Sequence, residues 1–124
     1  MSEEVRFSVE DANAAVPHLR ELLPRVREAR QGLIASSRRI SEDVAGDGGG
    51  VAGSDWFRHQ QVLKEAVEDL ARRGILLRDP ESGLVDFPSE RDGRTVYLCW
   101  RLDDPAGVEY FHDESAGYRG REPL

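Results

Sequence analysis

The stretch that decides the fold is LVDFPSERDGRTVYLCWRL, residues 84–102. Apolar and polar side chains alternate on both sides of the dipeptide Asp92-Gly93, which is a strong signal for a tight turn between antiparallel strands. The sequence therefore predicts a β-hairpin with strands over 84–87 and 95–102. Pairing across the turn places four apolar side chains on one face, with Phe87 opposite Leu98 and Val85 opposite Trp100.

Two further strands are expected beside this hairpin. Residues 75–77 precede a turn at 79–83, and residues 108–112 follow the Asp-Asp-Pro turn at 103–105. Pairing across the first turn sets Leu77 near Val85 and Ile75 near Phe87, on the same apolar face. Since two independent turns agree, we predict an antiparallel meander of about four strands over 75–113. Its apolar face should pack on helices, which makes the fold class α+β.

A long helical hairpin is expected before the sheet. Apolar residues recur every seven positions over residues 8–45, which is typical of a helix that packs along another helix. Ser8 and Asp11 resemble a capping box at its start. Pro17 and Pro24 interrupt the segment, and the sequence leaves open whether they kink one helix or join a short helix to a long one.

The second helix of the hairpin is expected over residues 54–73. The Gly-rich stretch GDGGGVAG at 46–53 predicts a loop, and Ser54 is the expected N-cap. Gly74 follows as a stop signal. At 1.5 Å per residue the two helical segments would be about 55 Å and about 28 Å long.

This difference in length bears on the oligomeric state. Part of the longer helix would stay uncovered by the shorter one, and a second copy of the chain is the simplest cover. We therefore expect a homodimer through the helices. The alternative is that the residues before Pro17 fold against the rest of the chain.

Composition limits the setting of the protein. The 124 residues are 39% hydrophobic and carry a formal net charge of −7, which fits a single domain over residues 1–124 and disfavours a nucleic-acid partner. No apolar run is long enough to span a membrane. The acidic N-terminal segment lacks the apolar stretch of a secretory signal, and the lone Cys99 suits a reducing compartment, so we expect a cytoplasmic location.

The other face of the predicted sheet carries polar candidates, among them Asp86, Cys99 and Arg101, with Asp86 opposite Cys99. The register of the last hairpin decides whether His112 joins them. If Arg101 pairs with Glu109, His112 points to the apolar face. A shift of one residue, or a bulge, instead brings His112 beside Cys99 and Asp86. The sequence leaves this choice open.

In the shifted register, Asp86, Cys99 and His112, together with Asp113 or Glu114, supply ligand types that suit a transition metal. No short-spacing motif such as Cys-x-x-Cys or His-Glu-x-x-His supports such a site. Cys99 and His112 could also form a nucleophilic pair with Asp86 as the orienting acid. Against that hypothesis, a cysteine within a strand is more often a small buried apolar residue.

The C-terminal tail, residues 114–124, holds Tyr118 and Arg119 between two glycines, followed by Arg121. Glycines allow close backbone approach, and the arginine fork suits carboxylate or phosphate. Alternatively, the tail folds back and pairs its arginines with acidic residues of the sheet. Four residues are the candidates for binding a small anion: Asp86, Arg101, Arg119 and Arg121.

Several segments also resemble a bacterial family catalogued as domain of unknown function 2203. They are FSVEDAN at 7–13, GLVDFP at 83–88, VYLCWR at 96–101, YFHD at 110–113 and AGYRGR at 116–121. The Gly-rich stretch at 46–53 departs from the family pattern. The resemblance implies a small cytoplasmic protein with a helical hairpin and a sheet, and it implies no activity, substrate or catalytic residue.

Two functional hypotheses follow. The first, which we adopt as the prediction, is a homodimeric interaction or regulatory module without catalysis, whose partner is an unidentified protein or a small anion. The second is a protein that binds a metal ion or a small anion, and a hydrolase falls under this hypothesis. It would use Asp86, Cys99, His112 and Arg121. The sequence identifies no cofactor and leaves enzymatic activity undecided.

Overall fold

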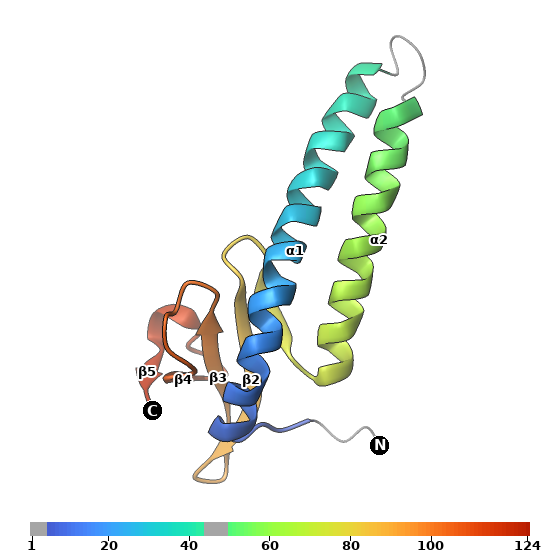
Figure 1. Ribbon diagram of the computed structural model, residues 1–124. Coiled ribbons are helices and arrows are strands. Elements are labelled where there is room, and N and C mark those ends of the chain that lie inside the picture. The colour runs from blue at the N-terminus through green and yellow to red at the C-terminus, as the bar shows by residue number, and fades with distance from the viewer. Residues whose placement is uncertain (1–4, 44–49) are drawn as a thin grey trace.

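The structure, a computed structural model, describes residues 5–43 and 50–124. Two long helices form a hairpin, and one end of this hairpin lies against a five-stranded antiparallel sheet (Figure 1). The helices are α1 (Val9–Asp43) and α2 (Gly50–Arg73). The strands are β1 (Leu76–Asp79), β2 (Leu84–Arg91), β3 (Arg94–Arg101), β4 (Tyr110–Asp113) and β5 (Glu122–Pro123), with a short 3-10 helix η1 (Tyr118–Gly120) before β5.

The central hairpin forms as the alternating pattern predicts. Phe87 pairs with Leu98 and Val85 with Trp100, and β1 pairs with β2 so that Leu77 lies opposite Val85. The turn at Asp92-Gly93 has positive φ at both residues, 54° and 76°. A two-residue hairpin turn of type I′ requires positive φ at both central residues. β2 continues through Pro88 to Arg91, beyond the predicted end at Phe87.

The fold class α+β is confirmed, but the predicted strand count is wrong. The strands follow one another in the order β1-β2-β3-β4-β5, so the meander has five members. The fifth comes from the predicted tail: Phe111 pairs with Glu122, and the backbone N–H of Leu124 donates to the carbonyl of Glu109. A strand of two residues leaves no alternation in the sequence, which is why the tail gave no strand signal.

Among the described residues, a hydrophobic core lies between the two helices and the apolar face of the sheet. Each buried strand residue in it has the parity that the hairpin register gives. The buried members are Ala12, Val16, Leu19, Leu23, Leu70, Ile75, Val85, Phe87, Val96, Leu98, Trp100, Val108 and Phe111.

α1 is one helix rather than two. Its start carries the predicted capping box, in which the Ser8 hydroxyl accepts from the Asp11 N–H at 2.9 Å and the Asp11 carboxylate accepts from the Ser8 N–H at 3.1 Å. Pro17 and Pro24 lie inside the helix, on its exposed side. A carbonyl that loses its partner to proline can be hydrated there, so the helix continues past both prolines.

α2 begins earlier than predicted. Gly50–Gly53 belong to the helix, so Ser54 lies within it and is not the N-cap. Residues 46–49 of the predicted loop lie outside the described residues. Gly50 and Gly53 are poor helix formers, but the packing of the remainder of α2 along α1 stabilises the whole helix. The carboxylate of Asp55 lies 3.0 Å from the guanidinium of Arg39 on α1.

The apolar face of α1 is covered along its length, although α2 is the shorter helix. The N-terminal half of α1, which carries Ala12, Val16 and Leu19, packs on the sheet, and α2 covers the remainder from about His18 onward. The alternative considered above, in which the first residues of α1 fold against the rest of the chain, is therefore the one that forms. The homodimer stays a prediction, and the difference in helix length no longer supports it.

No helix among residues 5–43 and 50–124 is both long and apolar enough to cross a membrane.

The segment FSVEDAN fastens the start of α1 to the sheet. The Phe7 ring meets Phe87 edge to face at 5.2 Å, and the Phe7 N–H donates to the carbonyl of Pro88 at 2.7 Å. One helical turn later, the side-chain oxygen of Asn13 accepts from the backbone N–H of Val108 at 2.7 Å. Val108 is buried, so this N–H depends on Asn13 for its hydrogen bond.

Asn13→Ala should therefore destabilise the fold by about 1–2 kcal/mol, because it leaves the buried Val108 N–H without an acceptor. Asn13→Asp keeps an oxygen at the same position and should lose clearly less. Urea unfolding of the three proteins measures the difference. Equal stability of the alanine variant and the parent would contradict this role.

Candidate metal centre

The face of the sheet remote from α1 carries a buried polar cluster. Asp86, Cys99 and His112 come from the three adjacent strands β2, β3 and β4. Their side chains are only 2%, 1% and 4% exposed. One ligand atom from each, namely a carboxylate oxygen, the Sγ and an imidazole nitrogen, lies within 4.8 Å of the others.

The register of β3 and β4 brings His112 into this cluster. Tyr97 pairs with His112 and Cys99 with Tyr110, which is the shifted register and not the one with Arg101 opposite Glu109. The physical reason lies at Phe111. In the observed register Phe111 faces the helices and is 7% exposed, whereas the other register would place it on the polar face.

The hydrogen bonds of His112 define which nitrogen carries a proton. Nδ1 lies 2.8 Å from the backbone carbonyl of Asp113, and a carbonyl can only accept, so Nδ1 carries a hydrogen and donates. Nε2 lies 2.9 Å from Oδ2 of Asp86. In a neutral imidazole Nε2 has a lone pair, and an ionised carboxylate also offers lone pairs. A cation, either a proton or a metal ion, must therefore stand between the two atoms.

Asp86 is the most heavily engaged member of the cluster. Its Oδ2 also accepts from Nε of Arg78 at 2.9 Å, and the Arg78 guanidinium lies 5.3 Å from the ring of Tyr97. Tyr97 in turn stacks on His112 at 5.5 Å. The other oxygen, Oδ1, is buried and has no hydrogen-bond partner among the described residues. A buried acceptor without a partner is costly, so Oδ1 is a position where a ligand would be stabilising.

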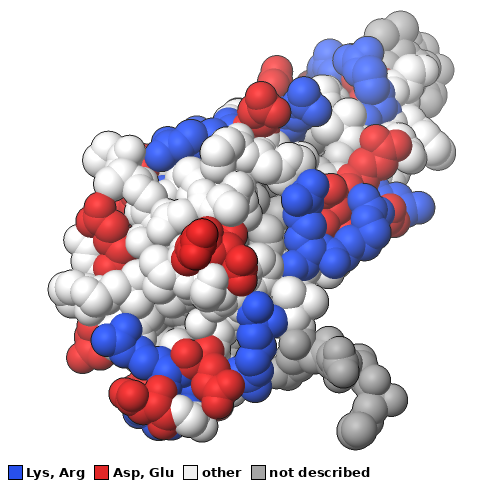
Figure 2. Space-filling model, turned by 60° about the horizontal axis from the view of Figure 1, so that its bottom comes forward, with Lys and Arg blue, Asp and Glu red and all other residues white. Residues whose placement is uncertain are grey.

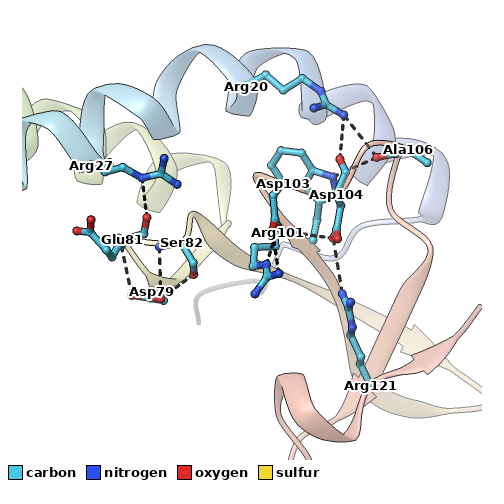
Figure 3. A network of polar contacts seen from close by, with 11 residues as sticks. Arg20, Arg27, Asp79, Glu81, Ser82, Arg101, Asp103, Asp104, Ala106 and Arg121 are labelled. Atoms are coloured by element: carbon cyan, nitrogen blue, oxygen red, sulfur yellow. Dashed lines mark hydrogen bonds and ion pairs between the residues drawn. The ribbon is translucent and has the colours of Figure 1, made fainter.

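Arg121 borders the cluster from the C-terminal segment. Its guanidinium carbon lies 4.0 Å from the ring centre of Tyr110 and 4.2 Å from that of Tyr118. Figure 3 shows the side chain directed at Asp104 in the β3–β4 loop, where Nη1 is 3.6 Å from Oδ2, beyond hydrogen-bond distance. Nη1 is buried and makes no hydrogen bond within the described part of the chain.

The same loop is held from the other side by α1. In Figure 3, Arg20 reaches down from the helix to the carbonyls of Asp104 and Ala106, at 3.3 and 3.5 Å. The β1–β2 turn is held in a similar way, because Arg27 donates to the carbonyl of Glu81 at 2.6 Å. The helix thus holds both the β3–β4 loop and the β1–β2 turn.

The electrostatics of the cluster keep Cys99 protonated in the metal-free protein. Burial, and next the negative charge of Asp86, raise the pKa of the Cys99 thiol to about 12. The positive charge of Arg121 acts in the opposite direction but does not outweigh them. A thiol in this state is a poor nucleophile, which removes the support for a Cys99–His112 nucleophilic pair.

Residues 6–124 match the model of a family described as uncharacterized conserved protein, DUF2203. The chain belongs to this family. Comparison with curated proteins and with solved structures gave no match. Four of the segments that suggested the family resemblance meet at the cluster of this DUF2203 chain: they contain Asp86, Cys99, His112 and Arg121.

The other predicted site residues lie elsewhere. Asp113 alternates with His112 to the opposite face, is about half exposed and lies 3.7 Å from Arg94, so it is not beside Cys99. Arg101 holds both oxygens of Asp103, at 2.6 and 2.9 Å. Arg119 is exposed.

The sequence analysis missed Arg78 as a neighbour of Asp86. It lies just after the predicted first strand, two positions beyond Leu76, which pairs with Asp86. The alternation of that strand, continued for one more residue, would have placed Arg78 on the same face. Tyr110 and Tyr118 were missed for a different reason, since they enter the site through the shifted register and the fold of the tail.

We expect Cys99 of the metal-free protein to resist a thiol reagent at neutral pH and to react at once in denaturant, because it is buried and protonated. Arg119→Cys provides a matched control, since it adds an exposed thiol nearby that should react in the native protein. The reagent is a disulfide that releases an aromatic thiolate, and the absorbance of this thiolate measures the reaction of both cysteines. Native Cys99 reacting as fast as the added thiol would contradict the burial described above.

Proposed function

We propose that this DUF2203 chain binds one divalent transition metal ion, of the zinc class, through Asp86, Cys99 and His112. The single observation behind the proposal is that three buried side chains from three strands bring together a sulfur, a nitrogen and an oxygen ligand. Sulfur, imidazole and carboxylate together suit Zn²⁺ and its neighbours better than they suit Mg²⁺ or Ca²⁺.

The spacing of the ligand atoms supports the proposal. In a tetrahedral zinc site, bonds of 2.0–2.3 Å set the ligand atoms about 3.3–3.6 Å apart. The atoms here lie between 2.9 Å, for the His112–Asp86 pair, and the 4.8 Å limit of the group. The spacing of a tetrahedral site falls within this range.

The hydrogen bonds of His112 and Asp86 also fit a bound metal ion. A backbone carbonyl is a usual acceptor for the second ring nitrogen of a metal-bound histidine, and the bond from Nδ1 of His112 directs Nε2 into the cluster. A metal ion would also satisfy Oδ1 of Asp86, which a proton shared with Nε2 would leave without a partner. Three protein ligands leave one coordination position open, as in sites that bind a further ligand.

The test is metal analysis of untagged protein dialysed against Zn²⁺ or Co²⁺. We expect about one ion per chain, with thiolate absorption from bound Co²⁺. Cys99→Ala and His112→Ala should each weaken binding by more than the roughly 10–100-fold typical of a residue that only orients a ligand.

Asp113→Asn is the matched control for His112→Ala, since Asp113 is the next residue but lies on the other face. It should bind the ion like the parent protein. Absence of bound ion in the parent would refute the proposal, as would an equal loss in Asp113→Asn and Cys99→Ala. If the alanine variants do not fold, the thiolate absorption of the parent protein still decides.

A second candidate function, a homodimeric interaction module, is favoured by a different surface. An open groove of about 600 Å³ runs between α1 and α2 on an apolar floor that includes Leu22, Ala29, Val62 and Ala66. Its rim mixes three arginines with three acids: Arg25, Arg58, Arg72, Glu28, Glu65 and Asp69. Figure 2 shows basic and acidic groups lying side by side on the part of the hairpin that it displays. A surface of both signs can pair with itself across a two-fold axis, which favours a second copy of the chain as the occupant.

Light scattering across a range of concentrations should then give twice the monomer mass. Val62→Glu places a charge in the groove and should produce a monomer, while Val67→Glu, on the same helix but outside the groove, should leave the dimer intact. Both valines are already partly exposed, so neither change should unfold the chain. A parent protein that stays monomeric at high concentration would refute this second function.

A further inference from the structure

We infer that the open position on the metal ion takes the carboxylate of a small monoanionic molecule, with Arg121 holding its second oxygen. This inference rests on the proposed metal site and names the class of ligand that the site would accept.

The charge balance of the site favours an anion. A divalent ion would be neutralised by the carboxylate of Asp86 and the thiolate of Cys99. Arg78 then contributes a positive charge 2.9 Å from Oδ2 of Asp86, and the charge of Arg121 is balanced by Asp104. Among the described residues the site therefore carries an excess of about one positive charge. A monoanion cancels it, whereas a phosphate dianion would exceed it.

Arg121 is positioned to supply the specific contact. The two tyrosine rings at 4.0 and 4.2 Å restrict its guanidinium, so little conformational entropy is lost when it binds a ligand. Its buried Nη1 has no hydrogen-bond partner in the described chain, because Asp104 lies too far away at 3.6 Å. A fixed, buried donor that makes no hydrogen bond gains a charge-assisted one when a carboxylate oxygen reaches it.

Arg121 is linked by contacts and strand pairing to Cys99, one of the proposed metal ligands. Arg121 contacts the ring of Tyr110, and Tyr110 pairs with Cys99 across β3 and β4. A carboxylate is planar and carries two oxygens, so one can bind the metal while the other accepts from the arginine fork. Tyr118 and Arg121 come from the C-terminal segment, and their contact makes that segment part of the site.

The experiment uses the Co²⁺-loaded protein and acetate as the probe, at constant ionic strength. Acetate should change the visible spectrum of bound Co²⁺ in a saturable way, and acetamide, its neutral isostere, should not. Arg121→Gln should weaken acetate binding at least about tenfold while leaving Co²⁺ stoichiometry unchanged, because one charge-assisted hydrogen bond is lost.

Arg119→Gln is the matched control, since it removes the same charge two residues away from an exposed position, and it should bind acetate like the parent. If the parent protein takes up no Co²⁺, the metal proposal itself fails. If Co²⁺ binds but acetate gives no response, or both glutamine variants lose affinity equally, the metal site stands and this inference is overturned. A tighter response to inorganic phosphate than to acetate would contradict the monoanionic class.

Discussion

The two-residue turn at Asp92-Gly93 is the constraint on which the rest of the structure depends. It fixes the register of β2 against β3, and because side chains alternate with a period of two, it assigns every residue of both strands to a face. Phe87 and Trp100 are thereby directed to the helices, and Asp86 and Cys99 to the other side. One local backbone geometry therefore determines both the hydrophobic core and the centre of the candidate site.

The parts of the fold that follow from strong local signals could be predicted from the sequence, and the parts set by tertiary packing could not. The capping box at Ser8 and the central hairpin are local, and both form as expected. The start of α2 at Gly50 contradicts the local preference of its glycines, since the contact of the helix with α1 outweighs it. β5 exists only because β4 offers an edge for it to pair with.

The residues of the candidate site show the same difference between local signals and tertiary packing. Asp86 and Cys99 could be placed opposite each other because a defined turn connects their strands. His112 could not be placed, since the connection before β4 has no tight turn to fix its register and a shift of one residue reverses the face. The burial of Phe111 decides in favour of the cluster. The same alternation that brings His112 into the cluster places Asp113 outside it.

The buried polar groups on the polar face of the sheet lower the stability of a chain of this size. Removing a carboxylate and an imidazole from water costs several kcal/mol unless their partners are complete, and apolar side chains at the same positions would stabilise the sheet at least as well. Among the described residues, Oδ1 of Asp86 and Nη1 of Arg121 both lack a hydrogen bond, one an acceptor and the other a donor. Stability alone does not account for these two buried groups of opposite character. A cation beside the first and an anion beside the second would complete both, which is why we propose the metal site and the carboxylate site as two halves of one binding site.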